Sequence, residues 1–118
     1  MRGLAMNMRR SKFNDWRVRQ ALIYAFNFEY INEAQNANRQ QRITSYFSNS
    51  SLGMRAGAAS NKVAELLLDF VPELLPGTLE GYAFPKSDGT LSNRKNMRAA
   101  KKLLSAAGYE VSDGILKS

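Results

Sequence analysis

Carboxylates are the side chains of this chain best suited to acid–base or metal chemistry, and several recur at helical spacing. Acids four residues apart lie on one face of a helix, where they could share a proton or hold a metal ion. The 118-residue sequence contains no His and no Cys, so the commonest general base, the commonest metal ligand and the thiolate nucleophile are missing. We therefore interpret the acids as solvated helix faces and predict no enzyme, no catalytic residue, no metal and no cofactor. These acids are Glu29, Glu33, Glu65, Asp69 and Glu73.

Basic side chains give the chain a formal net charge of +7, which could attract nucleic acid, an anionic membrane surface or an acidic ligand. Four of them fall on one side of an expected helix near the end of the chain, and a phosphate-tracking surface would use such a stripe. No aromatic residue interleaves with it, although single-strand binders usually need rings for stacking. A small basic nucleic-acid-binding domain is therefore the alternative function, and an exposed helix face is favoured. The stripe consists of Arg94, Arg98, Lys101 and Lys102.

The irregular segment from Arg42 to Ser50 combines two aromatic rings with hydroxyl and amide groups. Such a mixture suits a loop that contacts a ligand, and it suits a loop that packs on a core equally well. The residues leave both interpretations open.

Helix signals dominate the first third of the chain. Asn14 or Asp15 is expected to cap a helix of about three turns, because a short side chain can accept from the free amides of the first turn. Asn27 is expected to cap a second helix that runs to about Ala34. Arg17 and Arg19 in the first helix oppose the helix dipole, so we expect them to be paired with a carboxylate or loop carbonyls. The apolar face of the first helix is Val18, Leu22, Ala25 and Phe26.

Further along the chain, apolar residues at i, i+3, i+4, i+7 and i+8 predict a helix over Asn61–Val71, which Pro72 ends or kinks. Ser92 or Asn93 should cap a last helix, and Gly108 should stop it. Its apolar stripe is expected to comprise Met97, Ala100, Leu104 and Ala107.

Two segments near the ends of the sequence are interpreted as strands. Gly3–Arg9 alternates in character, with Leu4, Met6 and Met8 on one face and Asn7 on the other. Ile115–Lys117 follows an Asp-Gly turn and is expected to lack a partner strand. There is no run of about 18 apolar residues, so we expect no membrane span.

Three blocks resemble extracytoplasmic solute-binding proteins of the oligopeptide/dipeptide class, which serve ABC importers, and most resemble the branch for microcin C and peptide uptake. They are MNMRRSKFNDWRVRQALIYAFNFEYIN (Met6–Asn32), RITSYFSNSSLGMRAGAAS (Arg42–Ser60) and NRKNMRAAKKLLSAAGYEVSDGIL (Asn93–Leu116). The blocks occur in the family's order and cover nearly the whole chain. The sequence departs from the family pattern at Asn27, Tyr30, Asn38, Ala59 and Tyr109.

The resemblance implies a helix-rich α/β chain of about four helices with one or two short strands. Family members have two lobes of a type II periplasmic-binding-protein fold, and this chain corresponds to an internal part of the second lobe. Residues 1–118 would then form a single domain that is a fragment of a longer receptor. The implied location of the longer protein is the periplasm, although this chain has no recognisable signal peptide.

The implied function is peptide capture for import, with a peptide ligand and an ABC permease as partners. Ligand contacts in the longer protein are expected at Asn7, Arg42, Ser45 and Tyr46. We expect that the chain alone binds no peptide usefully, that it self-associates, and that it does not bind nucleic acid.

Overall fold

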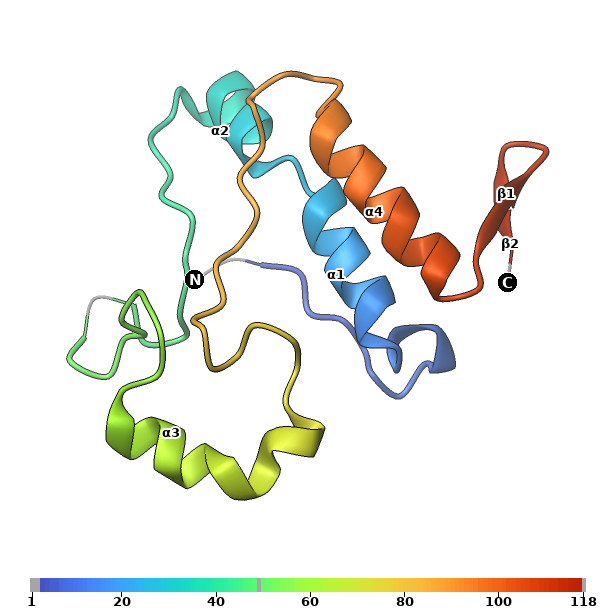
Figure 1. The fold of residues 1–118 in the computed structure, drawn as a ribbon. Coiled ribbons are helices and arrows are strands. Elements are labelled where there is room, and N and C mark those ends of the chain that lie inside the picture. Colours follow the sequence, from blue (N-terminus) through green and yellow to red (C-terminus); the bar gives the residue numbers. More distant parts are fainter. Residues whose placement is uncertain (1–2, 49, 118) are drawn as a thin grey trace. The chain divides into compact units, whose positions relative to one another are not determined.

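The structure is a computed structural model that describes residues 3–48 and 50–117. The described residues form helices α1 to α4, two 3-10 helices and one β-hairpin, in the order shown in Figure 1. This helix-rich composition confirms the expectation of about four helices with one or two short strands. Contacts divide the chain into two units, one made of the residues up to Arg42 together with those from Pro85 onward, and the other of Ile43–Phe84.

In the first unit, α1 (Trp16–Ala25) and α4 (Arg94–Ala106) pack side by side (Figure 1). The hydrophobic residues buried among the described residues are Val18, Ala21 and Ala100, all of which belong to this helix pair. Small side chains let the two backbones approach closely. The predicted apolar face of α1 is therefore only partly buried, since Leu22 and Phe26 remain 41% and 44% exposed.

The start of α1 is as predicted, because the side chain of Asp15 accepts a hydrogen bond from the Arg17 amide at 2.8 Å. The same carboxylate pairs with the guanidinium of Arg17, which also donates to the carbonyl of Ala106 at the end of α4. Arg19 donates to the carbonyls of Phe13 and Asn14. Both arginines are thus paired locally, as expected, and Arg17 additionally ties the two helices together.

Helix α2 (Phe28–Asn36) follows α1 directly after Asn27, as predicted, but the Asn27 side chain makes no capping hydrogen bond. Its buried residue is Asn32, whose side chain donates to the Gln40 carbonyl at 2.8 Å and accepts from the Gln40 amide at 3.1 Å. This pair of bonds folds the chain back along α2 directly after the helix ends.

Helix α4 begins after Asn93 and ends before Gly108, close to the predicted limits. The Tyr109 amide donates to the Leu104 carbonyl and the Gly108 amide to the Ser105 carbonyl, which satisfies carbonyls that the helix end leaves open. The Asn93 side chain makes no capping hydrogen bond, and its amide nitrogen donates to the Tyr24 carbonyl.

The last described residues form a hairpin of β1 (Glu110–Ser112) and β2 (Ile115–Lys117), in antiparallel register with Val111 opposite Leu116. Asp113 and Gly114 both have positive φ, as a tight two-residue hairpin turn requires. The expectation that Ile115–Lys117 lacks a partner strand is therefore wrong, because the Asp-Gly turn supplies a partner within the chain.

The strand expected at Gly3–Arg9 is also wrong. Residues 3–9 form no strand in the structure and lead into a short 3-10 helix, η1 (Ser11–Phe13). Alternating side chains are not sufficient for a strand, because the backbone also needs a neighbour to complete its ladder of hydrogen bonds.

The second unit, Ile43–Phe84, contains α3 (Asn61–Leu67) and the 3-10 helix η2 (Leu68–Glu73). The helical turn tightens at Leu68 and ends one residue beyond Pro72, so the predicted kink occurs slightly before the proline. Gly81 has φ +92, and a Cβ there would lie 2.1 Å from the Gly57 carbonyl oxygen, so only glycine fits this crossing of two backbones. None of the helices in residues 3–48 and 50–117 is long and apolar enough to cross a membrane.

Candidate functional site

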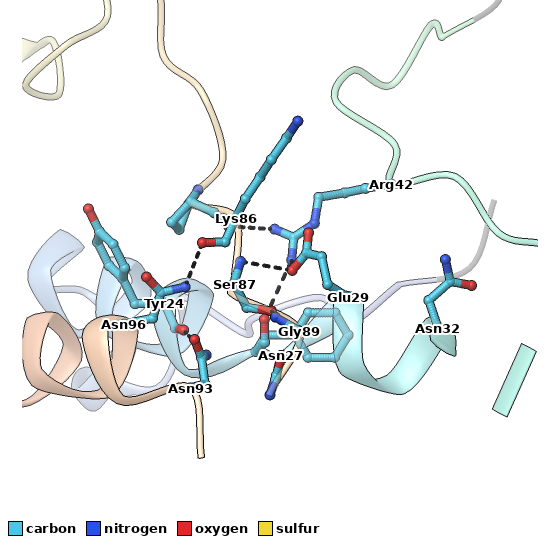
Figure 2. A network of polar contacts seen from close by, with 12 residues as sticks. Tyr24, Asn27, Glu29, Asn32, Arg42, Lys86, Ser87, Gly89, Asn93 and Asn96 are labelled. Carbon is cyan, nitrogen blue, oxygen red and sulfur yellow. Dashed lines mark hydrogen bonds and ion pairs between the residues drawn. The ribbon is translucent and has the colours of Figure 1, made fainter. Parts of the chain in front are cut away.

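The carboxylate of Glu29, in the first turn of α2, belongs to a network of polar contacts in the first unit (Figure 2). Its Oε2 accepts from the Ser87 amide at 3.0 Å and lies 3.4 Å from Nη2 of Arg42. The side chain is 28% exposed, so Glu29 is half-buried rather than solvated. The interpretation of all five helical acids as solvent-facing is therefore wrong for Glu29.

The protonation of Glu29 reflects this environment. Burial alone would raise the pKa of its carboxyl, but hydrogen bonds from Ser87 and the positive charge of Arg42 outweigh that effect and hold the pKa below the usual value. Glu29 is consequently ionised at neutral pH and serves as an acceptor for two partners.

Arg42 is engaged on several sides. Its Nη1 donates to the Pro85 carbonyl at 3.1 Å, Nη2 lies 3.5 Å from the Phe26 carbonyl oxygen, and the guanidinium carbon is 5.1 Å from the centre of the Phe28 ring. The side chain is 17% exposed, and its buried Nε has no partner among the described residues. The guanidinium therefore binds groups of its own chain at the edge of α2.

Three asparagines attach the segment after Pro85 to the helices (Figure 2). Asn27 donates to the Thr90 carbonyl at 2.7 Å, Asn93 to the Tyr24 carbonyl at 3.3 Å, and Asn96 to the Lys86 carbonyl at 3.1 Å. Asn93 and Asn96 are buried. The irregular segment 85–93 is thus held in two ways: the side chains of Asn27 and Asn96 bond to its backbone, and its own Asn93 side chain bonds to the backbone of α1.

Sequence reasoning missed these buried asparagines. Asn93 and Asn96 share helical spacing with the buried Ala100, so the period of α4 could have placed them on its packed face. A polar residue in such a position has to find a partner, and irregular backbone is the usual one.

The four expected ligand contacts are distributed over both units. In the first unit, Asn7 accepts from the Arg9 amide through Oδ1, and Arg42 has the contacts described above. In the second unit, Ser45 Oγ accepts from the amides of Phe47 and Met54, while Tyr46 is 86% exposed. Ser45 thus stabilises its own loop and Tyr46 presents its ring to solvent. A ligand role for these four residues stays a prediction.

The basic stripe on α4 is exposed at all four positions, as the interpretation of a solvent-facing helix side expects. No group of three or more acidic residues that could hold a metal ion occurs among residues 3–48 and 50–117.

A family model described as bacterial extracellular solute-binding proteins, family 5, middle, matches residues 1–117. The chain belongs to this family. The match confirms the resemblance to solute-binding proteins that the three sequence blocks indicated.

Two of the following three relatives are named for what they bind. The peptidoglycan-binding protein YepA of Agrobacterium fabrum is 40% identical over 118 residues, which cover 97% of this chain and 19% of the relative. The probable peptide-binding protein YejA of the same organism is 36% identical over 112 residues, covering 94% of this chain and 18% of the relative. YejA of Escherichia coli is 36% identical over 110 residues, covering 92% and 18%. The chain therefore spans about a fifth of the length of the curated relatives it matches.

Proposed function

We propose that this chain is a segment of an extracytoplasmic peptide-binding receptor that delivers its ligand to an ABC importer. The observation that carries the proposal is the match to family 5 over residues 1–117, together with a relative whose name specifies probable peptide binding. Members of such a family bind and release a solute, so the segment catalyses no reaction.

In the complete receptor, the segment would belong to the second of two lobes and contribute one wall of the ligand cleft. The longer protein would act in the periplasm, close around a peptide by hinge motion and dock on a permease. Ser45 and Tyr46 are the better candidates for ligand contact, because Tyr46 is exposed and Ser45 shapes the loop that carries it. Arg42 is the weaker candidate, because its guanidinium already binds Glu29 and the Pro85 carbonyl.

The name of the most identical of the three relatives cited above favours a second ligand class. YepA is named for binding peptidoglycan, and the peptide stems of cell-wall fragments offer main-chain groups that a peptide receptor could also bind. Free peptides and cell-wall peptides are therefore the two ligand classes to compare.

The test is a chimera in which this chain replaces the matching segment of Agrobacterium fabrum YejA. Isothermal titration with tri- to hexapeptides, and separately with a peptidoglycan stem peptide, should show binding by the chimera and none in the micromolar range by the isolated chain. A folded chimera that binds neither, while the parent YejA binds, would refute the proposal. Micromolar binding by the isolated chain would refute the view that one wall of the cleft is insufficient.

The nucleic-acid alternative predicts a different result on the isolated chain. A phosphate-backbone binder should bind oligonucleotides at low salt and weaken steeply as salt rises. Fluorescence anisotropy with a single-stranded and a duplex oligonucleotide should show no binding at physiological salt.

A further inference from the structure

The segment Ile43–Phe84 leaves the first unit at Arg42 and returns to it at Pro85, and these two residues are in direct contact. The bond from Arg42 Nη1 to the Pro85 carbonyl, at 3.1 Å, joins the residue before the segment to the residue after it. Both ends of segment 43–84 are therefore attached at the same place in the first unit.

Glu29 completes this attachment from α2. A single carboxylate oxygen, Oε2, accepts from the Ser87 amide on the returning chain and faces Arg42 on the departing chain (Figure 2). The partners are separated from Glu29 by 58 and 13 residues respectively. The carboxylate thus bridges the two ends in addition to the direct bond between them.

The surroundings favour a durable attachment. Exposed ion pairs contribute little because water and salt screen them, but here the two side chains are only 28% and 17% exposed. The Phe28 ring covers one side of the guanidinium, and cation–π contacts gain strength when they are shielded from water. Asn96 adds an independent bond to the Lys86 carbonyl of the returning chain.

We propose that Glu29, Arg42, Pro85 and Ser87 form a clasp that fixes the residues at both ends of segment 43–84 to α2, independently of the packing of the α1–α4 pair. The clasp assigns Arg42 and Glu29 a conformational role that is separate from ligand binding and that does not depend on the proposed function.

Spin labels can measure the clasp directly, because the chain has no cysteine of its own. Gln41→Cys and Lys86→Cys place labels on two exposed residues that flank the clasp without removing any of its side-chain contacts. Pulsed electron–electron distance measurements on the full chain should give one narrow distribution. Adding Glu29→Ala should broaden that distribution or shift it to longer distances, whereas Glu33→Ala, an exposed acid on the same helix, should leave it unchanged. A narrow, unshifted distribution in the Glu29→Ala chain would overturn the proposal.

Hydrogen exchange separates the clasp from general destabilisation. In Glu29→Ala, the Ser87 amide should exchange about tenfold faster or more, as expected for losing a hydrogen bond to a charged acceptor. Glu29→Gln keeps an oxygen for the Ser87 amide but loses the ion pair, so it should preserve most of that protection. The amides of α1 and α4 should be unaffected in both variants. Equal loss of protection in α1 and α4 would show that Glu29 supports the whole unit, and the clasp would be wrong.

Discussion

The two units of the chain are held by different kinds of interaction. In the first, side chains reach backbone groups far away in the sequence, such as Arg17 to Ala106 and Asn93 to Tyr24, and the buried residues gather between α1 and α4. In Ile43–Phe84, the described side-chain hydrogen bonds join residues that are close in sequence. The largest separation along the sequence is between Met54, whose amide donates, and Ser45. The apolar helix residues of this unit stay exposed, with Leu66 at 76% and Phe70 at 55%. Apolar residues thus recur at helical spacing in both units, but the buried hydrophobic residues that the structure describes all lie in the first.

The largest expected effect comes from placing a charge on one helix of each unit, and it tests whether the two units differ in burial. Ala100→Asp buries a carboxylate at a position that is 4% exposed, so we expect the free energy of unfolding to fall by about 3 kcal/mol or more. Leu66→Asp on α3 should change it by about 0.5 kcal/mol or less at protein concentrations low enough to keep the chain monomeric. Urea unfolding followed by fluorescence of Trp16, the single tryptophan, measures both variants on a probe in α1. Comparable losses would mean that α3 is as well buried as α4.

A smaller effect is expected for the buried asparagines. Asn96→Ala leaves the Lys86 carbonyl without its partner, which should cost about 1–3 kcal/mol in the same unfolding experiment. Asn61→Ala, at an exposed residue of α3, is the matched control and should be close to neutral. If Asn96→Ala were also neutral, side-chain bonds to segment 85–93 would not distinguish the first unit.

The sequence predicted local features well and tertiary partners poorly, and the reason is physical. The Asp15 cap, the Gly108 stop and the pairing of Arg17 depend on residues within a few positions, so spacing alone determines them. The burial of α3 depends on whether another surface covers it, and the spacing of apolar residues in α3 does not identify such a surface. The Glu29 network joins residues 58 positions apart, which no local pattern encodes. The strand expected at residues 3–9 failed for the same reason, since a strand needs a neighbour.

Exposed apolar residues in segment 43–84 lead to a prediction about assembly. Large apolar patches promote association, so we expect the isolated chain to form dimers or larger oligomers rather than a monomer of 13.2 kDa. Because β2 already pairs with β1, we expect the contact between chains to form on the helix surface of α3 and η2 rather than through a terminal strand. Leu66→Glu should weaken association about tenfold or more, since a buried leucine contributes roughly 1.5–3 kcal/mol.

Light scattering over a concentration series measures this association. Met97→Glu, at a half-exposed residue of α4, is the control for the first unit and should leave association unchanged. A monomer at every concentration would contradict the prediction. A stronger effect of Met97→Glu than of Leu66→Glu would move the contact to the α1–α4 pair.

The smallest expected effect is a pH dependence of the Glu29 ion pair. The pKa of Glu29 in the folded chain lies below its ordinary value of about 4.3, so the folded state favours the ionised carboxylate. Its contribution to stability is therefore complete above that ordinary value and is lost as pH falls below it toward the folded pKa. The positive charge that faces it belongs to Arg42, which stays protonated throughout.

Wild type should be more stable than Glu29→Gln by about 1 kcal/mol or less near pH 6, and this difference should shrink as pH falls below about 4. Taking the difference cancels the acid titration of Asp15 and Asp88, whose pKa values are also lowered by their own hydrogen bonds. Urea unfolding of both proteins across this pH range measures it. A difference that stays constant with pH would show that the charge of Glu29 contributes nothing to the stability of the folded chain, which contradicts the prediction.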